Sequence, residues 1–561
     1  MNKMTSTNRR VSTLARLAFV ALSAAAPACT GDAGPVGDKG TDGTNGQAGK
    51  DGMTGKDGTA AIVDQRLSAT DKAFVAIGGK DAVMKLDSLT MSIAGHSWIK
   101  DEGYTPDAVA TDVGTFTLSM TYDIKAKNLR NDYERNITFI GVAKTTFSEY
   151  IRDNLGYIGG TESILGQPSG NMTSDRWAST LKHQRLLNPH LLLRDVAADP
   201  SLATDAGVAL LDGSVHHLVK INDKHPVTLW VSSQTGTIDK LATLENDWLH
   251  RDIEVDVFFT GWKPADNGLN FPSDAYIAKG GVIVHAEHRN SVKVNAAIDP
   301  TIFNFPAGAT PKFDQALADL GDTGHEYAQD YASAGVPLDG QQVFVKSTML
   351  SPNVYHLTGG SHHTMVVEQT NGVVVIEAPL YEARSQAVID WIKANLPGKP
   401  ITHVVSTHFH SDHASGLRTF VAAGATIVAG KAAAPFYKKI FKASSAVLPD
   451  PLAVTPKAAK IIVVPDGGSY SMDDPANPVV AYQVDNPHAD GMLIGYLPVQ
   501  KIVFTSDLYS PGFPVAPPAL PGAVALFDAI ESTYKLPVVS IAGGHGVGAV
   551  PYEVYKTAIG K

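Results

Sequence analysis

The run His408-Phe409-His410-Ser411-Asp412-His413 constrains the fold of this 561-residue chain more than any other feature. It directly follows an apolar segment, residues 401–407, that is typical of a short buried strand. Just past a strand end, residues two apart point the same way, so His408 and His410 can hold one ion. Asp412 and His413 lie where the next helix begins and can face a second ion. Imidazole and carboxylate groups suit zinc, and also iron or manganese.

The other ligands must come from distant parts of the chain, because nothing near this run closes a metal site. His488, Asp507 and His545 each lie at or just after a predicted strand, residues 479–484, 501–505 and 538–541 respectively. Layered α/β folds place their sites in the loops at such strand ends. The sequence therefore predicts two coordination sets that share one carboxylate.

Residues 342–561 resemble the metallo-β-lactamase superfamily, whose fold is an αβ/βα sandwich. The run at 408–413 matches the His-x-His-x-Asp-His signature of that family, and the later ligands match it in order and spacing. The resemblance assigns the first ion to His408, His410 and His488, the second to Asp412, His413 and His545, and a bridging role to Asp507. It implies two zinc ions as cofactors, with iron or manganese as alternatives. Asp412 and Asp507 would orient the attacking hydroxide.

Four more side chains are candidates for the surroundings of the site. Glu377 follows the predicted strand 372–376, where the family generally has Asp, and its longer side chain leaves the orienting role in question. His362 and His363 precede the predicted strand 364–368 and either line the substrate cleft or form an ordinary loop pair. Tyr509 either donates a hydrogen bond to a developing oxyanion or packs in the core.

The predicted reaction is metal-dependent hydrolysis of an ester, thioester, lactone or amide in a small-molecule substrate. Hydrolases of β-lactams, lactones, thioesters, sulfate esters and phosphodiesters share this ligand set, so it does not select among them. The net charge of -10 argues against nucleic acid as a partner. One alternative is an envelope lipid- or lipoprotein-binding protein with an inactive hydrolase domain. Another is an iron-dependent oxygenase of the same fold.

The N-terminus is typical of an export signal, residues 1–28. Four basic residues precede an apolar run, residues 17–26, which ends at Pro27-Ala28-Cys29. This end resembles the lipobox of bacterial lipoproteins, although it lacks Leu three residues before Cys29. The resemblance implies acylation of Cys29 and a lipid anchor in the cell envelope, at the outer membrane because Thr30 replaces Asp. Without the lipid, the protein would be periplasmic or secreted.

Glycine occupies every third position from Gly31 to Gly58, which gives ten unbroken Gly-X-Y triplets. This is the collagen pattern, in which only glycine fits at the axis of three packed chains. Residues 29–60 are therefore predicted to be a lipid-anchored spacer. The spacer either assembles a homotrimer or simply extends, and Pro35 is the only proline within the repeat.

Two globular parts are predicted to follow the spacer, so that the whole is a multidomain α+β protein. Residues 61–310 mostly alternate apolar and polar side chains, which favours an antiparallel sheet shaped as a half-barrel. Short helices are predicted at 150–155 and 179–186, and residues 226–305 resemble the LolA-like lipoprotein-sorting fold. Residues 311–340 are predicted to be a linker. Residues 341–561 alternate short strands with helices, as expected for the hydrolase sandwich.

Overall fold

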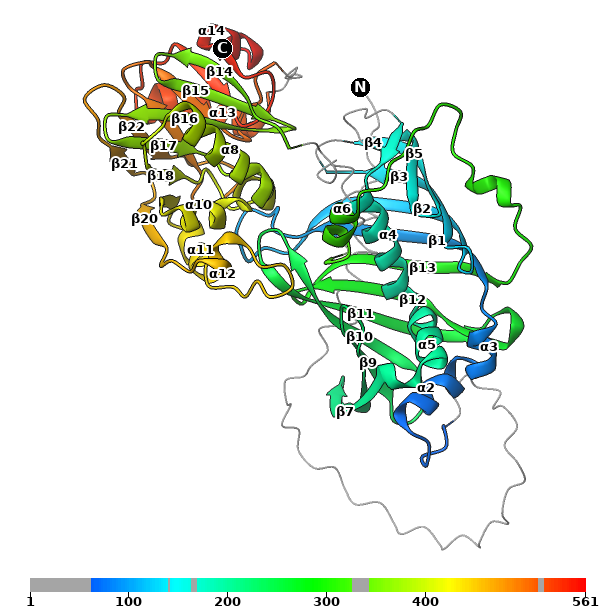
Figure 1. The fold of residues 1–561 in the computed structure, drawn as a ribbon. Helices are drawn as coiled ribbons and strands as arrows, with labels where there is room; N and C mark the ends of the chain where they lie inside the picture. Colours follow the sequence, from blue (N-terminus) through cyan, green and yellow to red (C-terminus); the bar gives the residue numbers. More distant parts are fainter. Residues whose placement is uncertain (1–61, 140–141, 163–168, 325–342, 513–518) are drawn as a thin grey trace, which may run out of the picture. The chain divides into compact units, whose positions relative to one another are not determined.

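The computed structural model describes residues 62–139, 142–162, 169–324, 343–512 and 519–561 (Figure 1). Residues Ala60–Lys561 form one compact unit. The expected signal peptide, Cys29 and the Gly-X-Y repeat lie outside the described residues, as does the second half of the expected linker. Within the described ranges, no helix combines the length and the apolar character needed to cross a bilayer.

A single antiparallel sheet of 13 strands dominates the first globular part. Its strands are β1 (Ser88–Ile99), β2 (Thr111–Asp123), β3 (Asn128–Ile137), β4 (Ala143–Arg152), β5 (Leu155–Thr161), β6 (Gly170–Met172), β7 (Ala203–Leu211), β8 (Ser214–Ile221), β9 (Val227–Ser232), β10 (Ile238–Asp247), β11 (Arg251–Pro264), β12 (Asn270–Lys279) and β13 (Val282–Val294). Their order is β6-β5-β4-β3-β2-β1-β13-β12-β11-β10-β9-β8-β7, so β6 and β7 are edges and the sheet does not close into a barrel.

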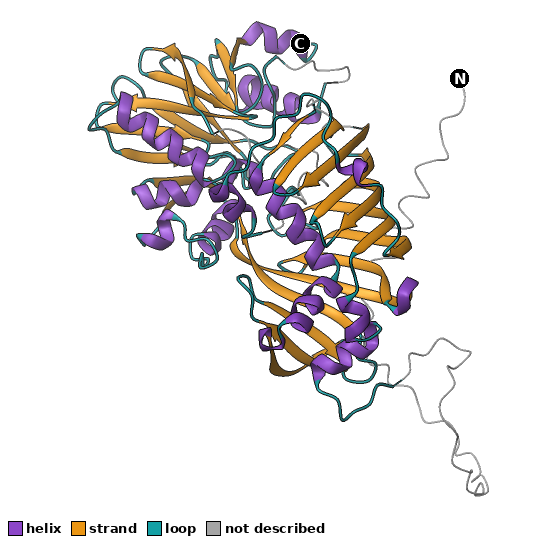
Figure 2. Ribbon diagram, turned by 45° about the vertical axis from the view of Figure 1, so that its right-hand side comes forward, coloured by secondary structure: helices purple, strands orange, loops and turns teal. Residues whose placement is uncertain are grey.

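Helices cover one face of this sheet, as Figure 2 shows. They are α2 (Ala69–Ile77), α3 (Lys80–Met84), α4 (Ser174–Leu187), α5 (Pro189–Ala198) and α6 (Gln315–Gly321), with short 3-10 turns at Pro200–Leu202, Asp266–Gly268 and Pro300–Phe303. In β2, Phe116, Leu118 and Met120 are buried while the residues between them are exposed, so one face of the strand meets the core. Leu192 and Leu193 of α5 join that core. The prediction of a mostly antiparallel first part is confirmed.

The helix expected at residues 150–155 is wrong. Tyr150 lies in β4 opposite Tyr157 of β5, and the chain turns between the two strands. Phe147 and Ile151 are buried on one face of β4, whereas the Arg130 guanidinium stacks over the Tyr150 ring on the other, 4.7 Å from its centroid. Every second residue of β4 from Thr145 to Ile151 is buried, which is the two-residue period of a strand. The helix expected at 179–186 lies within α4.

The C-terminal part contains two sheets that face each other. The seven-stranded sheet runs β14 (Lys346–Ser351), β15 (Val354–Gly359), β16 (His362–Gln369), β17 (Gly372–Ile376), β18 (Ile401–Val405), β19 (Thr426–Gly430) and β20 (Lys460–Val464). The six-stranded sheet runs β21 (Ser469–Met472), β22 (Val479–Gln483), β23 (Leu493–Leu497), β24 (Ile502–Thr505), β25 (Ser540–Gly543) and β26 (Ala549–Pro551). Strands β17 to β20 are parallel, as are β24 and β25.

One apolar core lies between the two sheets and another lies beneath the helices. Ile376 and Val405 of the first sheet pack with Leu493 and Phe504 of the second. The helices are α8 (Glu382–Asn395), α9 (Ser411–Ala414), α10 (Leu417–Ala423), α11 (Ala433–Ile440), α12 (Pro451–Val454), α13 (Pro521–Asp528) and α14 (Tyr552–Ala558), with a π turn at Ala529–Thr533. Figure 1 shows α8, α10 and α11 against the seven-stranded sheet. The expected sandwich of two sheets with outer helices is confirmed.

Candidate metal centre

The seven predicted ligands come together although they are spread over 138 positions of the chain. Each lies just past a strand of one of the two sheets: His408 and His410 after β18, Asp412 and His413 in the short helix α9, His488 after β22, Asp507 after β24 and His545 after β25. The parallel strands β17, β18, β24 and β25 end on one edge of the sandwich. Their loops therefore converge.

The side chains form two groups, each compact enough for one ion. His408, His410, His488 and Asp507 place their ligand atoms within 4.8 Å of one another. His362, Asp412, His413 and His545 do the same. The two groups contain the seven predicted ligands; Asp507 belongs to the first group only, and the second also contains His362, for which the sequence left a loop role open.

Asp507 lies between the two groups and turns one oxygen to each. Its Oδ1 is 3.0 Å from Nε2 of His413 and 3.0 Å from Nε2 of His545. Its Oδ2 is 3.1 Å from Nε2 of His488 and 3.6 Å from Nε2 of His408. Ligand atoms about 2.1 Å from a tetrahedral ion are roughly 3.4 Å apart. The spacing of these atoms therefore fits coordination of two ions by one carboxylate.

Three of the histidines are fixed through the ring nitrogen that faces away from the cluster. Nε2 of His410 lies 2.9 Å from the carbonyl of Gly103, and Nδ1 of His545 lies 3.0 Å from the carbonyl of Ser361. Nδ1 of His413 lies 2.7 Å from a Glu377 carboxylate oxygen. In a neutral imidazole, a ring nitrogen that donates to such an acceptor leaves the opposite nitrogen unprotonated, and this is the form that binds a metal.

Glu377 is completely buried beneath the cluster and makes the orienting contact that its length left in question. One oxygen accepts hydrogen bonds from Thr407 Oγ1 at 2.6 Å, Ser506 Oγ at 2.6 Å and His413 Nδ1 at 2.7 Å. Its backbone has φ 77°, a left-handed conformation that is uncommon for a residue with a side chain. The strand β17 thus ends in a turn that directs this carboxylate under the histidine.

The other three candidates occupy different places. His362 begins β16, lies 3.0 Å from Asp412 Oδ2, and has its ring 4.1 Å from that of His545. His363 instead binds the carbonyl of Gly546 at 2.8 Å. Tyr509 is buried in the hydrophobic core, where its ring meets that of Tyr555 at 4.8 Å.

Burial and charge set the protonation of the cluster. Burial lowers the pKa of His408 well below its ordinary value, with help from the neighbouring histidines, and lowers the pKa of His410 to about 4. Burial also opposes charge on Asp507, but His413 and His545 hold its pKa well below the ordinary value. The buried His410 Nδ1 and Asp412 Oδ1 have no hydrogen-bond partner among the described residues. Burial opposes charge on His413 and His545, but the carboxylates around them raise their pKa. Neutral His408 and His410, an ionised Asp507 and unpartnered ligand atoms fit the binding of divalent cations.

Sequence reasoning missed two residues at this centre, Glu102 and Gly103. They lie in the loop between β1 and β2, more than three hundred positions before His410, with which both are in contact. Neither belongs to a recognisable motif. Only the packing of the first part of the chain on the second brings them to the cluster.

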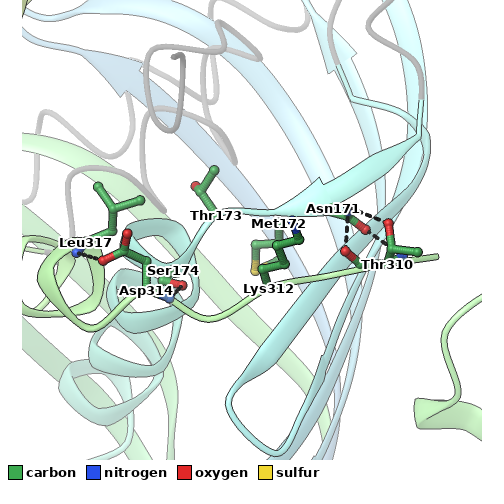
Figure 3. A pocket seen from close by; sticks show the side chains of 8 residues that line it. All are labelled: Asn171, Met172, Thr173, Ser174, Thr310, Lys312, Asp314 and Leu317. Carbon is green, nitrogen blue, oxygen red and sulfur yellow. Dashed lines mark hydrogen bonds between the residues drawn. The ribbon is translucent and has the colours of Figure 1, made fainter. Parts of the chain in front are cut away.

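A separate pocket of about 410 Å³ lies in the first part, where β6 meets α4 (Figure 3). Asn171 Nδ2 donates to the carbonyl of Thr310 at 3.0 Å, and Ser174 Oγ accepts from the backbone N–H of Asp314 at 2.8 Å. These bonds span the pocket and tie the segment before α6 to the start of α4. The pocket is a junction between two chain segments.

Comparisons with known proteins concern the C-terminal part. A metallo-beta-lactamase from Pontibacter korlensis is 19% identical over 39% of this chain and 98% of its own, with a TM-score of 0.30. DIM-1 metallo-beta-lactamase is 16% identical over 38% of this chain and 95% of its own, with a TM-score of 0.30. The stereoselective inverting sec-alkylsulfatase Pisa1 from Pseudomonas sp. is 16% identical over 38% of this chain and 40% of its own, with a TM-score of 0.29. The search of curated proteins found no match.

The family comparison agrees with the fold and with the cluster. Residues 357–545 match the model of the metallo-beta-lactamase superfamily. The match begins in β15 and ends at His545, so it contains all seven predicted ligands as well as Glu377 and His362. The C-terminal region of this chain is therefore a metallo-β-lactamase superfamily domain.

Proposed function

We propose that the C-terminal domain is a dinuclear metal hydrolase that cleaves an ester, thioester, lactone or amide bond in a small-molecule substrate. The position of Asp507 carries this proposal, because one carboxylate contacts histidines of two groups at 3.0–3.6 Å. The family match supports hydrolase activity in general. Nitrogen and oxygen ligands in sets of four favour zinc, with iron or manganese as alternatives.

Each residue of the cluster has a separate proposed role. His408, His410 and His488 would hold one cation, His413, His545 and Asp412 the other, and Asp507 both. Two bound cations would lower the pKa of a water molecule to near neutrality and polarise the scissile oxygen. Asp412 has its Oδ1 free of hydrogen bonds and can accept one from that water. Glu377 holds His413 in place through the short bond to Nδ1.

We further propose that the protein works in the cell envelope. The support is in the sequence: a basic and then apolar N-terminus, a single cysteine at the expected cleavage point, and ten Gly-X-Y triplets. Cys29 would carry the lipid, and residues 31–58 would separate the hydrolase from the membrane. Extended at about 3.1 Å per residue, the triplets would span roughly 90 Å. A homotrimer through these triplets belongs to the same proposal.

Metal analysis and a substrate panel test the hydrolase. The purified full-length protein is expected to contain about two ions per chain and to hydrolyse at least one class among chromogenic esters, thioesters, lactones and β-lactams. Removal of metal by a chelator should abolish turnover, and zinc should restore it. His408→Ala is the inactive control. A folded protein without metal, or turnover that is insensitive to the chelator, would contradict the proposal and favour the envelope-binding alternative.

A further inference from the structure

The loop between β1 and β2, residues 100–110, reaches the metal centre from the first part of the chain. The carbonyl of Gly103 accepts a hydrogen bond from His410 Nε2 at 2.9 Å. A carboxylate oxygen of Glu102 lies 3.4 Å from His410 Nδ1, the nitrogen that faces the cluster. The other oxygen of Glu102 accepts from Ser411 Oγ at 3.2 Å. The loop therefore contacts both nitrogens of one predicted ligand.

Hydrogen bonds hold this loop in place on the side of its own sheet. Asp101 Oδ2 lies 2.6 Å from Nε2 of His250, which follows β10, and its Oδ1 accepts from Lys100 Nζ at 2.7 Å. The carbonyl of Glu102 accepts from Thr111 Oγ1, the first residue of β2, at 2.8 Å. The loop thus has a defined shape before its contacts with the cluster are counted.

The hydrolase domain also holds the loop. The carbonyl of Tyr104 accepts a hydrogen bond from the backbone N–H of Asp490 at 2.7 Å, two residues beyond the predicted ligand His488. Gly103 lies between these attachments, and a Cβ there would overlap the methyl group of Ala108. Only a residue without a side chain lets the loop fold back closely enough to present the Gly103 carbonyl.

Hydrogen bonds at a second place also join the first globular part to the hydrolase domain. Asp252, near the start of β11, accepts hydrogen bonds from the backbone N–H groups of Ala446 and Val447 at 2.7 and 3.0 Å. Arg251 donates to the carbonyl of Leu448 at 2.9 Å. The chain segment that follows α11 is therefore bonded to the same sheet that carries the loop. The contacts of Glu102 and Gly103 are therefore part of a larger hydrogen-bonded interface between the large sheet and the hydrolase domain.

We propose that the β1–β2 loop is a positioning element of the metal centre, which fixes His410 through Gly103 and Glu102 and thereby strengthens the first metal site. This inference rests on the proposed function only in that the cluster binds metal. The second group does not depend on the loop in the same way, because His413 is fixed by Glu377 and His545 by Ser361. Loss of the loop contacts is expected to weaken one site and spare the other.

The physical reason is the two-sided geometry of an imidazole ligand. When Nε2 donates to the Gly103 carbonyl, Nδ1 carries no proton and its lone pair faces the cluster. The Glu102 side chain, which is 8% exposed, lies beside that nitrogen and is held there by the hydrogen bond from Ser411 Oγ. Outer partners of this kind typically change metal affinity 10- to 100-fold.

Zinc affinity of the full-length protein, measured for each site by competition with a chromogenic chelator, tests the proposal. Gly103→Ala displaces the loop, and Glu102→Gln replaces the carboxyl group beside His410 by an amide while keeping the shape of the side chain. Both variants are expected to weaken one zinc site about 10- to 100-fold and to leave the other unchanged. Asp107→Asn, an exposed position of the same loop, is the matched control and should bind zinc like the wild type.

The outcomes separate the two proposals. Wild-type protein that binds neither zinc, iron nor manganese overturns the proposed function itself. Wild-type protein that binds two ions, together with Gly103→Ala and Glu102→Gln variants of unchanged affinity at both sites, overturns the role of the loop. The melting temperature and circular dichroism of each variant are measured in parallel. Equal weakening of both sites, or a loss of zinc that only follows a loss of folding, also contradicts a selective effect on His410.

Discussion

Replacement of Asp507 by alanine gives the sharpest test of the two-ion arrangement. This side chain is 17% exposed and contacts His413 and His545 with one oxygen, and His408 and His488 with the other. Asp507→Ala therefore removes one ligand from each set. His545→Ala removes a ligand from the second set alone, which makes it the matched comparison.

The size of the effect follows from the charge that Asp507 supplies. Two unit charges about 4 Å apart interact with about 4 kcal/mol at an effective dielectric constant near 20, and two divalent cations with about four times as much. If a quarter of that repulsion, about 4 kcal/mol, is no longer offset, the second ion binds about a thousandfold more weakly. Simultaneous occupancy should then fail at ordinary metal concentrations.

Elemental analysis after dialysis against metal-depleted buffer measures the outcome. Asp507→Ala is expected to retain one ion or fewer per chain and to lose more turnover than His545→Ala. Asp507→Asn, which keeps the shape and removes the charge, should resemble Asp507→Ala in metal content. An Asp507→Ala protein with two ions and near-normal turnover would refute the bridging role.

Three further predictions concern other parts of the chain. Glu287 is buried beside Arg289; burial opposes its charge, but Arg289 lowers its pKa to about 2. Since the folded pKa lies below the ordinary value, the ionised Glu287 stabilises the protein above about pH 4.5, and this stabilisation disappears toward pH 2. Glu287→Gln should therefore lower the free energy of unfolding by about 3 kcal/mol at pH 7 and by little near pH 2. Equal losses at both pH values in a denaturant titration would contradict this. Glu377→Gln should weaken the zinc site of His413 about 10- to 100-fold in chelator competition, and unchanged affinity would argue against the orienting role. Cys29→Ser should move the protein from membrane to soluble fractions, and unchanged partitioning would exclude the lipid anchor.

Much of the hydrolase fold could be predicted because its strands are short apolar runs with polar ends. The predicted strand 372–376 coincides with β17, and the predicted strand 401–407 exceeds β18 by two residues. The clustering of the candidate ligands could be predicted for the same reason, since each of them follows such a run. His362 was harder to place, because β16 begins two residues before the predicted strand and so carries this imidazole into the cluster.

The rest depended on contacts between distant segments. Residues 150–155 contain enough hydrophobic and charged side chains for one turn of helix, and only pairing with the neighbouring strands selects the extended form. The contact of Gly103 with His410 joins a loop of one sheet to a loop of another. No local periodicity or residue spacing predicts such a contact, because it forms only when the surfaces of two separately folded sheets pack against each other.

The pairing of β1 with β13 has a consequence for how the chain reaches its native state. Leu89 pairs with Val294, so the two central strands of the large sheet are about two hundred residues apart in sequence. Each half of the sheet, β1 to β6 and β7 to β13, consists of neighbouring strands that can pair early. The pairing of β1 with β13 is expected to form late, because ordering the long intervening chain costs entropy before the two strands make their contacts. Until β13 has been synthesised, β1 has an unpaired edge, and we expect slow folding and sensitivity to aggregation during that interval.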